Sequence, residues 1–512
     1  MNISPKAQRV IDWRESMAIL NDDFFFEIAR MYLGEIKTPF NKTDLIERIS
    51  AFLRKEENKA KIISLLSNQD LKILLLVKTI PSCTRENILS FLKEEKKNSA
   101  IIFQQILNLE ERLLLFSFSD KKNRTESIRI NPLLENEIFP LLEKNILFPP
   151  SNTEDLKSSE DYISPSFLAA YTSFVLTHSD LLKNDGSLKK HATKEAQEIF
   201  ADKAGIIEPL SKAFLTLQLI HQNDKGVFAD YERLELFAKK KELEQVLYIA
   251  TAAAGHFSRR ELQSRTQNLF DTLNALPPYG ISLKNISKLS LLLKMEKSEG
   301  GIDFPSRFSL LMQKHSEDQD LQDSGIMEYI AENANALGLL VPCGKNSQGE
   351  PLYLANKKIL SATSITPPAE KKKCLSIDAG FSITIMPGLS LTQLLPLMLF
   401  LDIKHYDTAA VFEINRKSVI RAFDRGLQCK DITKELEKNS DFSLPQNLVF
   451  SLDEWQSSYN SATLYRGYVL KIKEEHAARI KKSPSIAKKI QEELAPGVFL
   501  FNFESDDEAE QR

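Results

Sequence analysis

Glycine is scarce in this sequence, and several patterns built on glycine, cysteine or histidine are missing. Only 17 of the 512 residues are Gly, although glycine normally makes up about 7% of a protein. No GxxxxGK[ST] stretch occurs, which excludes a P-loop that holds phosphates on backbone amides. The four cysteines form no CxxC pair and no HExxH or GxSxG motif is present, which argues against a zinc ribbon, a zinc protease and a hydrolase elbow. We therefore expect no catalytic residues, no metal, no cofactor and no enzymatic activity.

An excess of one charge is also missing, as is a long apolar run. Lys and Arg total 67 against 70 Asp and Glu, for a net charge of −3, which excludes a uniformly basic protein that coats nucleic acid. The longest apolar stretch, 389–403, contains Pro396 and Asp402 and is too short and polar to span a bilayer. The first residues carry charges where a signal peptide needs an apolar region. We expect a soluble, cytoplasmic protein with reduced thiols and no membrane partner.

Leu, Ile, Lys and Glu dominate the sequence, which favours helices. Apolar residues three and four positions apart predict helices in 5–34 and 41–53. Three short helical patterns then precede two β-prone runs around the polar tip KKNRTES. Three helices followed by a hairpin is the order of a winged helix, which we place at about 68–136.

The middle of the chain is again mostly helical and less regular. Polar residues predict linkers at 151–161 and at 361–373. Residues 210–237 combine an apolar helix, a turn and a β-prone run, and could form a second helical or winged unit. A further helix followed by a short hairpin is predicted around 347–349.

From Cys374 the pattern changes to strands interleaved with amphipathic helices, which predicts a compact α+β domain on one small sheet. Here the segments 474–482 and 485–494 are predicted as helices. The overall fold class is α+β and predominantly helical, with tandem winged-helix-like units followed by this α+β domain. The predicted parts are a helical segment at 1–67, a winged-helix-like unit at 68–150, a helical region at 162–360, the α+β domain at 374–503 and an acidic tail at 504–512.

The α+β domain contains the most specific pattern in the chain. A strand ends at Val411–Ile414, a helix runs from Ser418 to Gly426, and a second helix contains Ile432 and Leu436. Ser443-Leu-Pro445 and a long helix ending at Tyr459-Asn460 follow. This order resembles the N-terminal domain of the XPB-type DNA helicase family, over about 374–503.

The remainder of the chain looks like bacterial proteins in which this domain follows tandem winged-helix units. In those proteins an Asp-Trp helix opens the chain, as Asp12-Trp13 does here. The resemblance implies a role in DNA repair or transcription, close to DNA and to a partner subunit. The family's helicase motor has no counterpart in this sequence, so the resemblance implies neither ATPase nor unwinding activity.

The first candidate DNA-binding site is the tip of the predicted wing. Basic side chains at a wing can contact phosphates, and the candidates here are Lys121, Lys122, Arg124 and Arg129. In the preceding helix, Gln104 and Gln105 could read adenine edges. A winged unit used for protein contacts remains the stronger alternative.

The second candidate is the strongest local positive charge in the chain. Residues 466–489 contain eight Lys or Arg and two Glu, a pattern that binds phosphate or an acidic partner, or else forms a solvated helix face. The candidate residues here are Arg466, Lys471, Lys473, Arg479, Lys481, Lys482, Lys488 and Lys489.

Two classes of function follow from these observations. The first is a non-enzymatic protein associated with duplex or forked DNA in repair or transcription. The second is an interaction scaffold that docks a separate helicase or nuclease without binding DNA itself. The basic C-terminal segment favours the first class, and the near-neutral overall charge favours the second.

Overall fold

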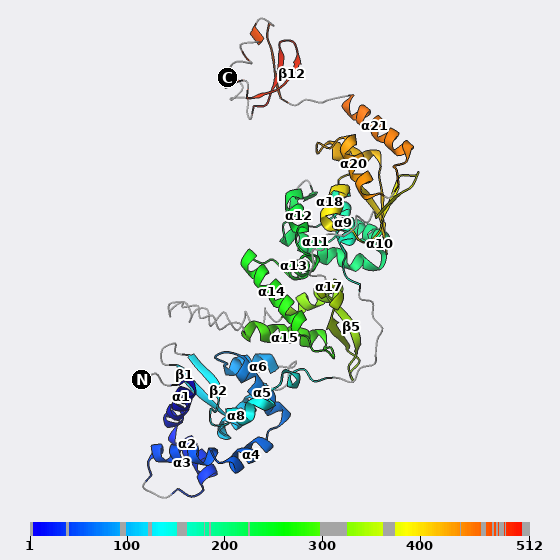
Figure 1. Cartoon of the computed structure of the whole chain (residues 1–512). Coiled ribbons are helices and arrows are strands. Elements are labelled where there is room, and N and C mark those ends of the chain that lie inside the picture. The colour runs from blue at the N-terminus through cyan, green and yellow to red at the C-terminus, as the bar shows by residue number, and fades with distance from the viewer. Residues whose placement is uncertain are drawn as a thin grey trace.

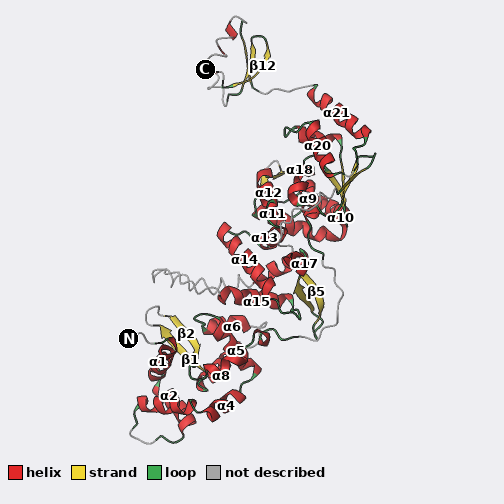
Figure 2. Ribbon diagram, in the orientation of Figure 1, coloured by secondary structure: helices red, strands yellow, loops and turns green. Residues whose placement is uncertain are grey.

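A computed structural model describes most of the chain (Figure 1). The described residues are 4–36, 40–92, 99–120, 125–150, 161–178, 180–183, 186–223, 226–296, 325–361, 374–440, 442–461, 467–473, 476–477, 480, 486 and 488–503. Helices predominate and the strands form small antiparallel sheets (Figure 2). The expected α+β, predominantly helical fold class is thereby confirmed. None of the described helices is long and apolar enough to cross a membrane.

Four helices open the described chain, and the first three share a small core with Leu113 and Phe116 of the unit that follows. The four helices are α1 (Pro5–Ile19), α2 (Asp22–Leu33), α3 (Lys42–Leu53) and α4 (Glu56–Ser64). Ser4, Asn21 and Asn41 each accept a hydrogen bond from the first turn of the helix that follows, which fixes where three of these helices begin. Trp13 and Phe25 are fully buried between them.

The first helix–hairpin unit follows these helices. It consists of α5 (Asn68–Thr79), α6 (Arg85–Leu92), α7 (Ser99–Glu111), β1 (Leu115–Asp120) and β2 (Thr125–Ile130). The Ile128 N–H donates to the Cys83 carbonyl at 2.7 Å. This hydrogen bond ties the turn before α6 to strand β2 of the hairpin. The short helices α8 (Glu135–Ile138), η1 (Phe139–Leu141) and η2 (Lys144–Ile146) complete this region.

Two further units repeat the order of helices and hairpin. The second contains α9 (Pro165–Thr177), α10 (Lys190–Phe200), η3 (Ala201–Ile206), α11 (Ile207–Thr216), β3 (Ile220–Asn223), β4 (Gly226–Ala229) and α12 (Tyr231–Ala238). The third contains α13 (Glu242–Ala252), α14 (Arg259–Ala275), α15 (Leu283–Glu296), a helix at 325–336, β5 (Leu340–Lys345), β6 (Pro351–Ala355) and α17 (Lys357–Ser361).

The three units share one backbone motif where the last helix meets the hairpin. A residue with positive φ ends the helix in each unit: Leu113, Gln218 and Gly338. The next residue is a leucine whose N–H bonds back to a helix carbonyl five residues earlier, at 2.8–2.9 Å in all three units. The carbonyl of the same leucine accepts an N–H from the residue that ends the hairpin, at 2.9–3.0 Å. This agreement identifies an internal structural repeat.

The residue that ends the hairpin also shows how the repeat varies. Asn131 and Asn356 each donate through Nδ2, at 2.8 Å, to the carbonyl of the positive-φ residue of their unit. Asp230 occupies this position in the second unit and has no N–H to donate through its side chain. Instead Asp230 caps α12 through the Arg233 N–H at 3.0 Å, and the Arg233 guanidinium bonds to the side chain of Gln218. The same backbone turn is therefore stabilised by an Asn side chain in the first and third units and by Asp230 and Arg233 in the second.

A four-stranded sheet follows the third unit and packs on the second. Its strands are β7 (Leu375–Ile377), β8 (Ser382–Ile385), β9 (Asp402–Tyr406) and β10 (Ala410–Glu413), in the order β7-β8-β10-β9. The helices are α18 (Leu391–Met398), α19 (Arg416–Phe423), α20 (Cys429–Asn439) and α21 (Gln446–Asn460). Ser173 of α9 bonds to the Leu401 carbonyl at 2.7 Å and accepts the Ile403 N–H at 2.9 Å. The buried apolar residues of this sheet also belong to the same continuous core as those of the three preceding units.

The last strands form a separate sheet, which corrects the expectation of one sheet after Cys374. They are β11 (Tyr468–Lys471), β12 (Ile490–Ala495) and β13 (Val498–Phe501), with β13 in the centre. In Figure 1 this sheet lies apart from the main body. Its small core contains Phe499 and Phe501, which are buried but belong to neither larger cluster.

Two elements of this C-terminal region differ from the sequence prediction. Residues 490–495 form strand β12, whereas the prediction placed a helix at 485–494, because Gln, Glu and Leu all favour helices. The turn at Gly497, where φ is +75°, instead folds this segment back onto β13. Strand β9 was missed because it follows directly on the apolar run of α18, and periodicity does not separate a buried strand from a helix there.

Candidate nucleic-acid and protein interfaces

Of the four basic candidates at the predicted wing of the first unit, one lies within the described residues. Lys121, Lys122 and Arg124 lie outside the described residues. Arg129 lies on β2, where its Nη1 is 2.9 Å from Oδ2 of Asp12 in α1. Its guanidinium carbon also lies 3.6 Å from the centroid of the Phe118 ring. The Arg129 side chain therefore joins the hairpin to the first helix of the chain.

The helix before this wing has one exposed and one engaged glutamine. Gln104 is exposed, whereas Nε2 of Gln105 donates to Oδ1 of Asp70 at 3.1 Å. Arg112 Nη1 reaches the other oxygen of Asp70 at 3.1 Å. Burial alone would raise the pKa of Asp70, but the hydrogen bonds from Ser67, Gln105 and Arg112 outweigh it and lower that pKa. Gln105 thus stabilises a buried carboxylate inside the unit.

The exposed side of this helix, α7, combines the apolar Ile101 and Phe103 with the polar Gln104, Asn108 and Glu111. Ile101 is 55% exposed and Phe103 is 42% exposed, and α7 contains no Lys or Arg. Helices that enter the major groove contact phosphates and base edges through basic and amide side chains. The exposed side of α7 offers the amides of Gln104 and Asn108 but no Lys or Arg, so it lacks the cations that contact phosphates.

The equivalent helices of the other two units also lack free positive charge. On α11 the exposed cation is Lys212, which pairs with Glu208 at 2.9 Å. The helix at 325–336 exposes Glu328, Tyr329 and Glu332. Carboxylates on these faces would repel the phosphates of a duplex. Among the described residues, then, none of the three hairpin-proximal helices has a face suited to DNA.

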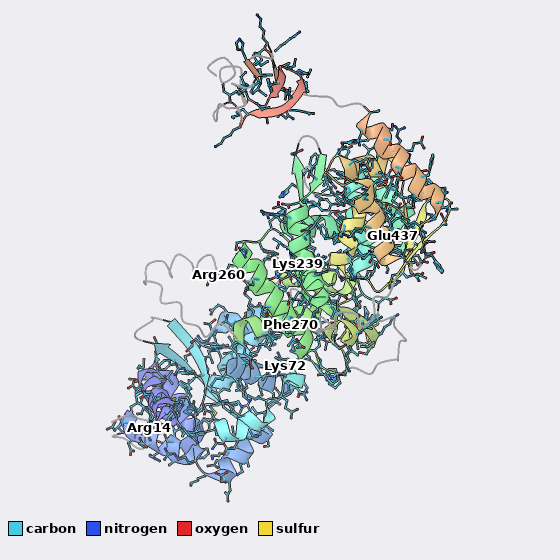
Figure 3. The ribbon with its side chains drawn as sticks, turned by 45° about the horizontal axis from the view of Figure 1, so that its top comes forward. Arg14, Lys72, Lys239, Arg260, Phe270 and Glu437 are labelled. Atoms are coloured by element: carbon cyan, nitrogen blue, oxygen red, sulfur yellow. The ribbon has the colours of Figure 1, made fainter. Side chains whose placement is uncertain are left out.

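The C-terminal three-stranded sheet and the residues beside its strands include four of the other eight basic candidates. Lys471 ends β11, Lys473 follows it, and Lys488 and Lys489 precede β12. Lys471, Lys473 and Lys488 are exposed and Lys489 is half-buried. Figure 3 shows the side chains of this sheet projecting outward from a small body. Arg466, Arg479, Lys481 and Lys482 lie outside the described residues.

Residues from two distant segments, 177–199 and 402–421, line a polar cleft of about 300 Å³. His178 and Glu195, from the α9–α10 region, approach to 3.2 Å through Nε2 and Oε2. Opposite them, Arg421 Nη2 donates to Oδ1 of Asp402 at 2.7 Å, and Lys417 is exposed at the rim. Sequence reasoning missed this cleft because its residues are more than 200 positions apart. The printed ion pairs lie within each segment, His178 with Glu195 on one side and Arg421 with Asp402 on the other.

Two of the buried cysteines, Cys83 and Cys429, have raised pKa values. Burial raises the pKa of Cys83 to about 12. Burial and a hydrogen bond to Asp453 raise the pKa of Cys429 to about 11. Both thiols are therefore protonated at neutral pH and poor nucleophiles. No group of three metal-ligating side chains occurs in the described part of the chain.

Comparisons with known proteins match two parts of the chain and one relative. A family model described as a helicase conserved C-terminal domain matches residues 391–495. A second model, described as an N-terminal domain, matches residues 1–54. An uncharacterized protein of Treponema pallidum (strain Nichols) is 24% identical over 458 residues, which cover 80% of this chain. The chain spans 61% of the length of that relative.

The helicase-related match runs from α18 to β12. It includes one side of the polar cleft and the lysines of the three-stranded sheet. The helicase-related part of the resemblance is thereby confirmed. The chain contains a helicase-related region, and the strongest local positive charge of the sequence lies within it.

Proposed function

We propose that this protein is a non-enzymatic, DNA-associated component of a DNA-processing complex in repair or transcription. The observation that carries the proposal is the concentration of eight Lys or Arg against two Glu in residues 466–489, inside the helicase-related match. Lysines that neutralise phosphates release counterions, and this term supplies most of the affinity of proteins that do not read sequence. Binding to the DNA backbone is the activity that this segment supports best.

The three helix–hairpin units act as winged-helix-like modules in this proposal, but not as readers of DNA sequence. The helix before each hairpin exposes apolar or acidic side chains, as Phe103 and Glu328 illustrate. Direct readout needs side chains that pair with base edges in the major groove. We assign these modules to contacts with proteins, and the C-terminal sheet to contacts with DNA.

We also propose that the protein is not an enzyme, and the side chains of the cleft and the thiols support this part of the proposal. The acids and bases of the cleft are balanced by their neighbours, and the two most buried thiols have raised pKa values. Four free thiols fit a reducing compartment, so the proposal places the protein in the cytoplasm. The resemblance to XPB-type helicases supports a helicase as a partner of this protein in the DNA-processing complex.

A scaffold that docks a helicase or nuclease without touching DNA is the second candidate. The specific observation in its favour is that the described faces of α7, α11 and the helix at 325–336 offer no cation free of a carboxylate partner. In that case the lysines of the three-stranded sheet would contact an acidic protein surface.

Fluorescence anisotropy on labelled duplex, single-stranded and forked DNA separates the two candidates. We expect micromolar or tighter binding to at least one of these probes, with affinity falling steeply as salt rises. Reversing Lys481, Lys482, Lys488 and Lys489 to Glu should abolish this binding.

A matched control reverses four other exposed lysines and so produces the same net charge. Lys239 (labelled in Figure 3), Lys241, Lys284 and Lys357 are exposed and lie outside the basic segment. This control should bind DNA within about threefold of the wild type, allowing for a change in long-range attraction. No binding by the wild type at low salt would leave the scaffold as the better account. Equal losses in both variants would show that binding is not local to the basic segment.

A further inference from the structure

An apolar groove of about 340 Å³ lies between the N-terminal helices and the first helix–hairpin unit. Met17 of α1, Leu20 just after α1 and Phe24 of α2 line one side of it. Leu107 of α7 and Phe116 of β1 line the other side. In Figure 1, α1 lies beside the β1–β2 hairpin. The groove therefore lies where the N-terminal helices meet the first helix–hairpin unit.

Exposed apolar side chains extend the groove along both helices. Phe103 is 42% exposed and lies one turn before Leu107 on α7, on the same face. Ile19 is 73% exposed and lies three positions after Ser16, which also lines the groove. Large apolar side chains that remain exposed beside an apolar groove mark an interaction site.

The charges around the groove are mainly negative. Arg85 is held by both carboxylate oxygens of Glu110 at 2.9 Å, and Glu126 lies 3.7 Å from its guanidinium. Two carboxylates therefore face one cation among the described lining residues. On α2, the exposed Asp23 and Glu27 precede Phe24 and Ile28, which line the groove.

We propose that this groove binds an amphipathic helix of a partner protein, with an apolar face and flanking Lys or Arg. The volume accommodates a few large side chains, so the partner must insert them from one face. A helix presents such a row at every third or fourth residue. The carboxylates at the rim favour basic flanks on that helix and disfavour acidic ones. This inference concerns protein binding and does not depend on DNA binding by the C-terminal segment.

A synthetic peptide of 18 residues with leucine on one helical face and lysine on the other is the probe. The full chain is titrated against this peptide, labelled for fluorescence anisotropy, in physiological salt. We expect a dissociation constant of tens of micromolar or tighter. A peptide with the same leucine pattern and glutamate in place of lysine should bind at least tenfold more weakly. A leucine–lysine peptide with a scrambled order, which cannot form one apolar face, should also bind at least tenfold more weakly.

Substitutions on the groove test where the peptide binds. Phe103→Ser and, separately, Leu107→Gln should each weaken binding at least fivefold, because each removes apolar contact area. Both side chains are exposed or half-buried, so circular dichroism should show an unchanged fold; Leu20→Gln, at a half-buried residue that lines the groove, serves as a third variant if either fails to fold. Leu236→Ser on α12 removes a leucine that is 64% exposed elsewhere and should leave binding unchanged.

Several results would overturn the proposal. Absence of binding, equal binding of the lysine and glutamate peptides, or equal losses in the Leu236→Ser control would each exclude a basic helix at this groove. A dimer in sedimentation velocity that Phe103→Ser dissociates would identify a second copy of the chain as the occupant instead. If the wild-type chain binds the leucine–lysine peptide but binds no DNA at low salt, the proposed function is refuted and this inference stands.

Discussion

The first helix–hairpin unit and the C-terminal three-stranded sheet carry similar basic signals in the sequence but use them differently. In the first unit Arg129 pairs with Asp12 at 2.9 Å and packs on Phe118, so its charge is neutralised inside the protein. On the C-terminal sheet Lys471, Lys473 and Lys488 are exposed. A basic residue therefore indicates a binding surface only when the folded chain leaves it without a carboxylate neighbour.

The comparison predicts its largest effect in DNA binding. Reversing Lys471, Lys473, Lys488 and Lys489 to Glu should lower duplex affinity more than about 100-fold, or roughly 2.7 kcal/mol. The slope of log K against log salt should fall by about 3 to 4, because up to four phosphate contacts are lost. Anisotropy titrations across salt measure both quantities. An unchanged slope would mean that these lysines do not contact phosphates.

The next effect concerns the stability of the first unit. Asp70→Asn should destabilise this unit by about 1–3 kcal/mol at neutral pH, because the side chain is buried and bonded to Arg112 and Gln105. The pKa of Asp70 is lowered in the folded chain. Its stabilising effect is therefore present above the unfolded pKa of about 3.9 and is lost as pH falls through the folded pKa.

Hydrogen exchange of α5 and α7 measures this loss. The difference between the wild type and Asp70→Asn should be largest at neutral pH and should shrink below about pH 4. Glu111→Gln, at an exposed carboxylate of the same unit, is the control and should show little change. A difference that is independent of pH would show that the charge of Asp70 does not contribute.

A smaller effect is expected for Arg129→Ala. Breaking its half-exposed ion pair and its contact with Phe118 should cost about 0.5–1.5 kcal/mol of local stability. Faster exchange of amides in α1 and β2 would report this loss. Duplex affinity should change less than about twofold. Arg14→Ala breaks a similar pair with Glu47 and is the control; a tenfold loss of affinity in Arg129→Ala alone would return Arg129 to the DNA interface.

Local patterns in the sequence were enough to predict many individual elements. Helical periodicity in residues 5–34 and 41–53 correctly indicated α1 to α3. The hairpin around Ser347-Gln-Gly349 is also present as β5–β6. These predictions succeeded because spacing and turn residues act within a few positions of each other.

Features that depend on distant contacts could not be predicted in this way. Residues 490–495 have helix-forming side chains, but pairing with β13 makes them a strand. The engagement of Gln105 by Asp70 and of Arg129 by Asp12 involves partners 35 and 117 positions away. The shared turn motif was hidden because Leu113, Gln218 and Gly338 have different side chains and share only a backbone conformation.

The central claim is that the C-terminal sheet binds the DNA backbone while the three helix–hairpin units do not read sequence. Salt titrations of the wild-type chain on two duplexes of equal length and unrelated sequence test it most directly. We predict equal affinities within about threefold and a slope of log K against log salt of about −4 to −7, which corresponds to five to eight phosphate contacts. A preference of tenfold or more for one sequence, or no binding at low salt, would contradict the claim.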